Sequence, residues 1–229
     1  MFLQPAHGGD HAVSGAWNTE VLKRDPATFL PRVAVDPIKR FCDVLASALL
    51  LFFFLPVLLL AALLIRLESR GPALFRQTRG GLNGKTFIIY KLRSMRCEEN
   101  GDSVVQAKRD DDRITRIGKL IRATSIDELP QLMNVLKGDM SLVGPRPHAQ
   151  AHDAYYGALI PAYQMRFQAR PGLTGLAQIK GLRGATNDVD DMANRVKADI
   201  DYIDNWSLLT DLRIMLLTVP HLLLAENAY

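Results

Sequence analysis

Residues 124–147 read TSIDELPQLMNVLKGDMSLVGPRP, and the rest of the chain is arranged around this segment. Leucine and methionine recur in it at helical spacing, which predicts an amphipathic helix that ends at Gly138. The start of this helix is open between two registers. Ser125 with Glu128 fits a capping box, whereas Pro130 favours a first turn that is capped nearer Asp127. In both registers, two adjacent carboxylates lie at the positive end of the helix dipole.

Asp127 and Glu128 are candidate ligands for a magnesium ion. The helix start favours their ionised forms and attracts phosphate to the same place. An anionic substrate there would need a cation, and Mg²⁺ is the hard ion that binds one or two carboxylates together with substrate phosphates. The alternative is that both acids are structural, one as a helix cap and the other as a charge that the dipole stabilises.

The segment closes with Gly144-Pro145-Arg146-Pro147, which places an arginine between two prolines. Each proline fixes its own φ and biases the preceding residue toward extended backbone, so Arg146 is held in few conformations. A guanidinium that is fixed in this way suits phosphate. The alternative is a surface turn with a solvated arginine.

Upstream, residues 73–95 alternate polar residues with β-branched and aromatic ones around a GGLNG segment, a pattern that predicts a β-hairpin. Lys91 and Arg93 lie two residues apart. On an extended strand they would share a face and could approach one phosphate group. The alternative for both is a solvated strand edge.

Two further basic residues border the central segment and a downstream loop. Arg122 ends a short basic helix predicted over residues 114–122, so we expect it near Asp127, as a phosphate ligand or as a charge partner. Arg170 opens the glycine-rich segment 170–178, whose backbone could approach a nucleotide closely. Pro-Gly turns of this kind are also common in ordinary loops.

Residues 44–65 form an uncharged apolar run that is long enough to cross a bilayer as a helix. Basic residues flank the run on both sides, and the positive-inside rule would place both flanks in the cytoplasm, which a straight span cannot do. Pro56 removes a helical hydrogen bond in the middle of the run. A helix-break-helix that dips into one leaflet and returns fits both observations. An ordinary, slightly kinked spanning helix is the alternative.

Composition sets the remaining limits. The chain has 229 residues, a formal charge of +4 and two cysteines, which suits one sizeable core and gives no disulfide framework. The basic residues form no block of nucleic-acid type, so we expect no nucleic acid partner. The other predicted segments are a loosely ordered tail over 1–36, a solvated polar loop over 97–113, helices over 148–168 and 189–206, and an interfacial or packed helix over 208–225.

Three motifs now follow the proline-containing apolar run in order: KLRSM, DELPQLMNVLKGDMSLVGPRP and RPGLTGLAQ. Together they resemble the small monotopic phosphoglycosyl transferases of bacteria, also called bacterial sugar transferases, from about residue 37 to residue 229. Some members carry an additional amino-terminal region with several spans, so we expect this chain to correspond to the catalytic part alone. The resemblance implies a re-entrant membrane helix over 37–70 and a cytoplasmic catalytic domain over 71–229.

The fold class that follows is α+β and predominantly helical, with interfacial amphipathic helices and a small β-hairpin. The family's re-entrant helix bends at a proline that matches Pro56, which implies an active site on the cytoplasmic face of a bacterial inner membrane. One departure is Leu55, which stands where some members have a serine that can bond the freed carbonyl.

The resemblance also implies a reaction, the transfer of a sugar 1-phosphate from a UDP-sugar to undecaprenyl phosphate with release of UMP, at the start of exopolysaccharide or glycoconjugate synthesis. In that family the aspartate of the Asp-Glu pair is the nucleophile and forms a covalent phosphosugar intermediate. Asp127 takes this role by analogy, and Glu128 with Mg²⁺ assists. Asp199 matches a further acidic position. The complete set of candidate phosphate-site residues is Lys91, Arg93, Arg122, Arg146, Arg170 and Asp199.

The segments KGLRGAT, NWSL and NAY look more like members that transfer glucose 1-phosphate or galactose 1-phosphate than like those that handle diacetamido sugars. The expected partners are the UDP-sugar, undecaprenyl phosphate and membrane lipid, and the sequence leaves open whether the chain forms a homo-oligomer. A second function from another class is a catalytically silent membrane protein that binds a sugar nucleotide and recruits polysaccharide assembly partners. The intact Asp-Glu pair favours the enzyme.

Overall fold

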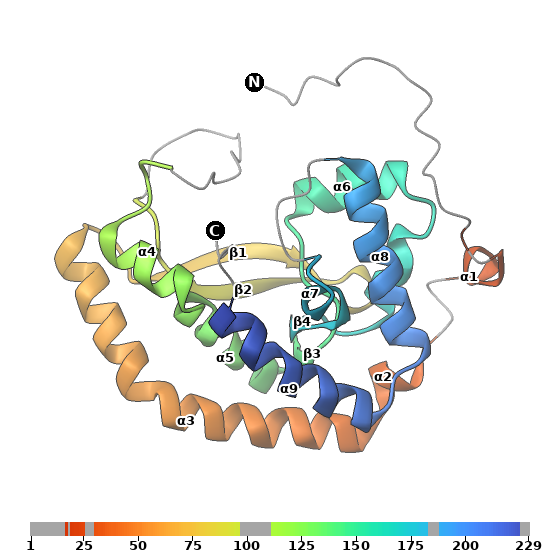
Figure 1. The fold of residues 1–229 in the computed structure, drawn as a ribbon, viewed down its shortest axis with the longest axis horizontal. Coiled ribbons are helices and arrows are strands. Elements are labelled where there is room, and N and C mark those ends of the chain that lie inside the picture. Colours follow the sequence, from red (N-terminus) through yellow and green to blue (C-terminus); the bar gives the residue numbers. More distant parts are fainter. Residues whose placement is uncertain (1–16, 18, 26–29, 97–110, 183–187, 225–229) are drawn as a thin grey trace, which may run out of the picture.

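The structure, a computed structural model, describes residues 17, 19–25, 30–96, 111–182 and 188–224 (Figure 1). Its longest element is α3 (Pro37–Glu68), a helix of 32 residues. Asp36 caps the start of α3, because its side chain accepts hydrogen bonds from the N–H groups of Ile38 and Lys39. The helix continues through Pro56, and Figure 1 shows that its axis bends as it wraps the lower edge of the molecule. The predicted apolar helix is confirmed. Pro56 does not divide it into two helices but lies within one helix that bends.

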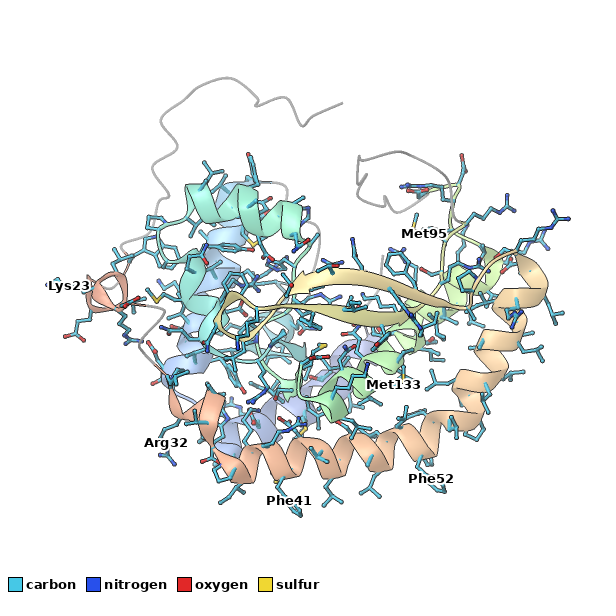
Figure 2. All side chains as sticks on the ribbon, turned by 180° about the vertical axis from the view of Figure 1, so that it is seen from behind. Lys23, Arg32, Phe41, Phe52, Met95 and Met133 are labelled. Carbon is cyan, nitrogen blue, oxygen red and sulfur yellow. The ribbon has the colours of Figure 1, made fainter. Side chains whose placement is uncertain are left out.

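The outer face of α3 is apolar and exposed. Phe52 and Phe53 are 81% and 72% exposed, and Figure 2 shows Phe41 and Phe52 pointing away from the body of the molecule. Among the described residues, α3 is the one helix that is long and apolar enough to cross a membrane. A continuous apolar surface of this kind marks a site of membrane or protein contact. Helix α9 (Leu208–Leu224) also exposes apolar side chains, Leu209, Leu212 and Leu216.

Buried polar groups fix the first turns of α3 to the rest of the molecule. Lys39 Nζ donates to Asp211 Oδ2 of α9 at 2.7 Å. Asp43 accepts hydrogen bonds from the Ser141 hydroxyl at 2.7 Å and from the Leu142 N–H at 3.1 Å. We call Lys39, Asp43, Ser141 and Asp211 the polar latch. Each of its charges is buried and paired, so removing one partner would leave an uncompensated charge in the interior.

The other end of α3 is held as well. Arg93 donates to the backbone carbonyls of Ser69 and Arg70, just beyond the last turn. Glu68 accepts hydrogen bonds from the N–H groups of Arg116 and Ile117, at 2.7 and 3.0 Å, and so caps the start of α4 (Arg116–Ala123). Both ends of the helix are therefore anchored to the rest of the chain.

The predicted β-hairpin is confirmed. Strands β1 (Leu74–Gly80) and β2 (Thr86–Leu92) pair antiparallel across a 3-10 turn, η1 (Leu82–Gly84). Asn83 and Gly84 take φ angles of 55° and 72°, a conformation that favours these two residue types.

The register of the hairpin decides which side chains face inward. Phe75 pairs with Lys91 and Arg79 pairs with Phe87. Directly paired residues project to the same side of a sheet, and so do alternate residues along one strand. Arg79 and Lys91 therefore share a face with Ile89, which is only 2% exposed. This face, defined by Arg79, Phe87, Ile89 and Lys91, is the inner face of the hairpin.

A second, parallel sheet consists of two short strands, β3 (Ser141–Val143) and β4 (Gly172–Thr174). The two segments approach so closely that a Cβ at Gly144 would lie 2.3 Å from the carbonyl oxygen of Arg170. The glycines of the predicted loop over 170–178 therefore permit contact with the protein's own backbone. The loop prediction was wrong for residues 172–174, which form β4, and for residues 176–178, which lie in the short helix α7 (Leu176–Ile179).

The main hydrophobic cluster lies among α5 (Leu132–Lys137), β2, β3, α8 (Val189–Asp204) and α9. Leu132 and Val135 are completely buried in it. The remaining elements are α1 (Thr19–Lys23), α2 (Arg32–Val35), η2 (Ile126–Gln131), α6 (Gln150–Leu159), η3 (Tyr163–Gln168) and α7 (Leu176–Ile179).

These elements confirm an α+β, predominantly helical fold and the helices predicted over 114–122 and 189–206. The helix predicted over 148–168 is divided into α6 and η3. Two short helices, α1 and α2, lie within the expected tail, where Val21 and Val33 are buried. Most of the predicted polar loop, residues 97–110, lies outside the described residues.

Candidate active site

The adjacent carboxylates lie in η2, between α4 and α5. Ser125 precedes η2 in the left-handed region at φ 55° and makes no side-chain cap, so the capping box with Glu128 is not formed. Gly138 ends α5 at φ 95°, as predicted. The predicted single helix is thus a 3-10 turn followed by an α-helix. Pro130 accounts for the division, because it has no N–H group to donate to the α-helical ladder.

Glu128 is the centre of an ion cluster. Its carboxylate is 9% exposed and accepts a hydrogen bond from Lys91 Nζ at 3.0 Å. Both terminal nitrogens of Arg146 also donate to it, one to each oxygen. This two-pronged contact is the strong form of an arginine–carboxylate pair. The structure therefore brings Lys91 and Arg146, two of the predicted cations, to the acidic pair.

Asp127 is half-buried beside this cluster. Burial, followed by the negative charge of Glu128, raises its pKa to about 6, although the charges of Lys91, Arg122 and Arg146 act in the opposite direction. Lys91 and Arg146 are already engaged by Glu128. Asp127 is therefore a carboxylate whose charge the protein's own cations balance incompletely, which is the electrostatic setting that a bound cation would complete.

The two carboxylates fit a magnesium ion by their chemistry. They are hard oxygen ligands, and Mg²⁺ commonly takes one or two carboxylates and completes its shell with water and substrate phosphates. The part of the chain that the structure describes contains no group of three or more His, Cys, Asp or Glu side chains that could hold a metal. A magnesium ion at Asp127 and Glu128 would therefore depend on the substrate for further ligands.

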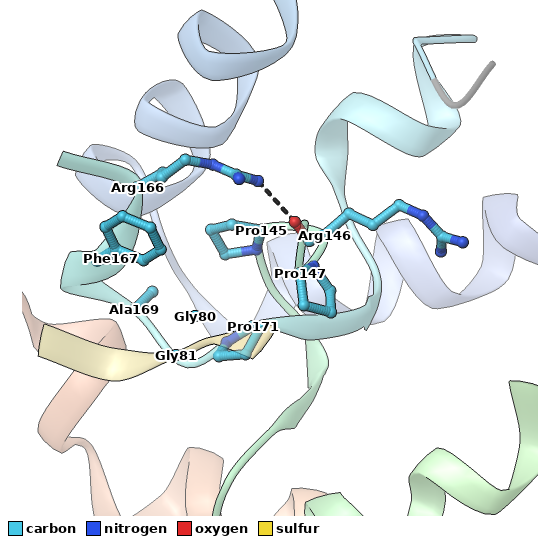
Figure 3. Close-up of a pocket in the computed structure, with 9 residues that line it drawn as sticks. All are labelled: Gly80, Gly81, Pro145, Arg146, Pro147, Arg166, Phe167, Ala169 and Pro171. Carbon is cyan, nitrogen blue, oxygen red and sulfur yellow. Dashed lines mark hydrogen bonds between the residues drawn. The ribbon is translucent and has the colours of Figure 1, made fainter. Parts of the chain in front are cut away.

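Arg146 is held from behind by a buried network. Arg166 Nη2 donates to the Arg146 carbonyl oxygen at 2.6 Å, the dashed contact in Figure 3. Asp199 balances the charge of Arg166 at 2.9 Å, and Tyr163 and His148 surround the same guanidinium. We call Arg166, Asp199, Tyr163 and His148 the Arg166 network. It fixes the backbone of the Pro-Arg-Pro segment, and so the direction in which the Arg146 side chain leaves it.

A small pocket lies beside the same segment, between the hairpin turn and η3 (Figure 3). Pro145, Pro147, Phe167 and Pro171 form much of its wall. Figure 3 shows that the Arg146 side chain extends away from Pro145 and Phe167. Because this guanidinium binds Glu128, the acidic pair lies on the other side of the Pro-Arg-Pro segment from the pocket.

Three of the predicted phosphate-site residues have other partners. Arg93 lies one residue beyond the end of β2 and binds the end of α3, so it does not join Lys91. Arg170 donates to the carbonyls of Gly138 and Ala34. Asp199 is buried against Arg166. Strand alternation grouped Arg93 with Lys91, but the strand ends before Arg93, and its two terminal nitrogens donate to nearby backbone carbonyls.

Arg122 lies in the last turn of α4, and its charge acts on Asp127. Within the described ranges it makes no ion pair shorter than 4.0 Å, so it remains available to a ligand. Nothing in the local sequence singles out Arg79 or Arg166. The alternation of the predicted hairpin, which places Arg79 on the same face as Lys91, is the signal that could have found Arg79. Arg166 lies inside a predicted helix and carries no such signal.

Comparison with known proteins places this geometry in context. A family model described as "Bacterial sugar transferase" matches residues 34–225. A Caulobacter vibrioides protein named "UDP-glucose:undecaprenyl-phosphate glucose-1-phosphate transferase" is 64% identical over 220 residues, which are 96% of this chain and 82% of that protein. An Escherichia coli K12 protein of the same name is 48% identical over 182 residues, 80% of this chain and 39% of its own length.

A third relative is named "Exopolysaccharide production protein PSS" and comes from Rhizobium leguminosarum bv. phaseoli. It is 48% identical over 188 residues, which cover 80% of this chain and 93% of the relative. The chain therefore spans most of the Caulobacter and Rhizobium proteins and about two fifths of the E. coli protein.

Proposed function

The chain belongs to the bacterial sugar transferase family, and from this membership we propose that it transfers a sugar 1-phosphate from a UDP-sugar to undecaprenyl phosphate and releases UMP. Glucose 1-phosphate is the first candidate for the transferred group, because the Caulobacter relative is named for it. The observation that carries the proposal is the cluster in which Lys91 and Arg146 bind Glu128 beside Asp127. Two carboxylates among several cations suit phosphoryl transfer, in which catalysis is mostly positioning and neutralisation of charge.

Asp127 is the proposed nucleophile. A carboxylate oxygen attacks the β-phosphorus of the UDP-sugar, and the bond from this phosphorus to the bridging oxygen breaks. The electron pair leaves with UMP, and the sugar phosphate stays on Asp127 as an acyl phosphate. A phosphate oxygen of the lipid then attacks the same phosphorus, which returns the carboxylate of Asp127 and gives a lipid diphosphate sugar.

The neighbouring residues have separate parts in these steps. Lys91 and Arg146 offset the negative charge of the phosphates, and Glu128 keeps both cations in place. Arg122 is positioned to offset the charge around Asp127. Mg²⁺, held by Asp127 and Glu128, would supply further neutralisation of the phosphate charge.

The membrane arrangement belongs to the same proposal. Chain regions on both sides of the apolar run are basic, which favours a cytoplasmic location for both, and the bend in α3 allows the helix to enter and leave one leaflet. The exposed apolar faces of α3 and α9 would then contact lipid, with the acidic pair at the cytoplasmic surface. In this position a soluble nucleotide and a lipid phosphate can reach the same site.

The deciding experiment measures UMP release by the purified protein in lipid nanodiscs, with undecaprenyl phosphate, Mg²⁺ and a panel of UDP-sugars. We expect turnover with one sugar, its loss when Mg²⁺ is chelated, and a decrease of at least about 10³-fold for Asp127→Asn. Asp201→Asn is the matched control, because the Asp201 carboxylate lies in a half-exposed ion pair with Lys180. Sugar nucleotide binding without UMP release from active-site-intact protein would instead support the scaffold function.

A further inference from the structure

We propose that Arg79 binds the phosphate of the nucleotide that departs as UMP, at the end of the site opposite to Lys91. This inference rests on the proposed function, and it concerns a residue outside the cluster around Glu128. The geometry of the hairpin, the contacts of the guanidinium and the direction of the membrane helix each support it.

The hairpin brings Arg79 to the site. Arg79 and Lys91 lie on its inner face, four residues apart in paired positions, which corresponds to a separation of about 13 Å along the strands. Arg79 also forms an isolated antiparallel bridge with Ala149, three residues after Arg146. The chain therefore places Arg79 between the Pro-Arg-Pro segment and the turn of the hairpin, and its side chain faces the side on which Lys91 meets Glu128.

The partly buried guanidinium of Arg79 is incompletely hydrogen-bonded. Its Nη2 donates to Gln77 Oε1, a neutral acceptor, and its buried Nε has no hydrogen-bond partner among the described residues. Glu128, whose charge acts on Arg79, is already bound by Lys91 and Arg146. A desolvated cation without a direct counter-ion is costly, and such groups are found where a ligand supplies the missing charge.

The pKa of Arg79 also supports a bound phosphate at this residue. Burial, followed by the charge of Arg146, lowers the pKa of Arg79 to about 10, while Asp153 and Glu128 act in the opposite direction. Arg79 stays charged at neutral pH, but the protein disfavours that charge. A phosphate placed between Arg79 and Arg146 would relieve the repulsion between them and would satisfy the open donor.

We assign the two phosphate-bearing substrates to opposite ends of the hairpin. Lys91 lies at the open end, which adjoins the last turn of α3 through Arg93. Under the proposed function, a lipid phosphate would arrive along that apolar helix. Arg79 lies toward the turn end, which Figure 1 places beside α6 and α8. A soluble nucleotide therefore has its phosphate on the Arg79 side, and the transferred phosphate lies between the two.

Asp153 offers a purely structural alternative. Its Oδ2 is buried close to Gly80 and has no hydrogen-bond partner in the described part of the chain, and its Oδ1 accepts from the Tyr163 hydroxyl. In this alternative Arg79 merely offsets the charge of Asp153. The two interpretations differ in what they predict for nucleotide affinity and for stability.

The test is calorimetric binding of UMP and of uridine to the full chain in nanodiscs, for the wild type, Arg79→Gln and Arg79→Lys. We expect Arg79→Gln to weaken UMP binding about 10- to 100-fold and to leave uridine binding unchanged, because only UMP carries the phosphate. Arg79→Lys should recover part of the loss. Arg76→Gln is the matched control from the same strand, where the guanidinium stacks on Tyr90 at 5.8 Å.

Three results would overturn the inference. Unchanged UMP affinity with a lower unfolding temperature for Arg79→Gln would assign Arg79 to Asp153. An increase in the KM for undecaprenyl phosphate alone would assign it to the lipid phosphate. Equal losses for UMP and uridine would mean that the site is distorted. Binding does not depend on turnover, so a wild-type chain that binds UMP but transfers no sugar would refute the proposed function separately.

Discussion

At the scale of single residues, the position of Arg146 depends on contacts at both of its ends. Its guanidinium grips both oxygens of Glu128, and its carbonyl oxygen accepts from the buried Arg166. The two flanking prolines restrict the backbone between these points. A side chain that is fixed in this way meets a phosphate with little further loss of conformational freedom.

Arg146→Lys tests whether the shape of the guanidinium matters in addition to its charge. A lysine keeps the charge but cannot donate to both oxygens of Glu128 in one plane. We expect kcat/KM for UMP release to decrease about 10- to 100-fold, with little change in unfolding temperature. Arg76→Lys on the exposed part of β1 serves as the control. Wild-type activity in the Arg146 variant would show that charge alone is sufficient.

His148 makes the fold sensitive to acid. Burial, followed by the charges of Arg166 and Arg195, holds its pKa well below its usual value of 6.5. The unfolded chain therefore binds more protons than the folded chain as the pH falls below about 6.5. The contribution of the neutral ring to the free energy of unfolding is complete above that pH, and it decreases below it by up to about 1.4 kcal/mol per pH unit.

We therefore expect the unfolding temperature of the wild type to decrease between pH 7 and pH 5 more steeply than that of His148→Gln. The measurement is thermal unfolding in detergent at a series of pH values. Parallel curves for the two proteins would show that another group carries the acid sensitivity. The titratable and charged groups that surround His148 are Arg146, His152, Asp153, Tyr163, Arg166, Arg195 and Asp199.

The sequence predicts those site residues that their immediate neighbours along the chain identify. Asp127 and Glu128 are adjacent, and Arg146 lies between prolines, so their neighbours along the chain identify them. Arg79 and Arg166 have no such neighbours, because their relevance comes from partners that only the fold supplies. Arg93 shows the opposite error, since a local pattern grouped it with Lys91 although the strand ends one residue before it.

At the scale of elements, the parallel pair of β3 and β4 positions the Pro-Arg-Pro segment. Gly144 follows β3, and Gly172 begins β4. Their backbones are so close that a Cβ at Gly172 would lie 2.1 Å from the Gly144 nitrogen. The turn and the glycine-rich composition could be read from the sequence. The pairing could not, because it joins segments about thirty residues apart and because three-residue strands have no periodicity to detect.

Gly144→Ala should therefore destabilise the protein and reduce its activity. The new Cβ would lie 2.3 Å from the backbone carbonyl oxygen of Arg170, which cannot move without separating the strands. We expect a loss of about 1–3 kcal/mol in the free energy of unfolding. Gly157→Ala is the matched control, because its Cβ would meet the end of the flexible Gln164 side chain at 3.2 Å and the Tyr163 ring at an ordinary contact distance of 3.7 Å. Equal unfolding temperatures for the two variants would contradict the close approach.

At the scale of the whole molecule, α3 both carries the apolar surface and belongs to the core. Composition alone identified the apolar run, and it also indicated that residues 208–225 are no second span. The polar latch was not predictable, because Lys39 and Asp211 lie 172 residues apart in the sequence. The proline at position 56 indicated a break, but one helix continues through it and bends, although Pro56 has no N–H group to donate.

Lys39→Met tests the polar latch. The substitution leaves Asp43 and Asp211 buried without their cation, and we expect a loss of about 3–5 kcal/mol in the free energy of unfolding. The double variant Lys39→Met with Asp211→Leu should lose less than the sum of the two single variants, because it removes the unpaired charge. Thermal unfolding in detergent measures both effects. Additive losses would show that the two side chains do not interact.

The two anchored ends of α3 also fix the distance between the apolar surface of this helix and the acidic pair. The latch holds one end and the contacts of Arg93 and Glu68 hold the other, so the apolar stretch between them cannot slide relative to the carboxylates. Once that stretch settles in lipid, the acidic pair stands at one elevation above the hydrocarbon. A water-soluble donor and a lipid-soluble acceptor, which partition into different solvents, can then meet at a distance from the membrane that the length of this helix fixes.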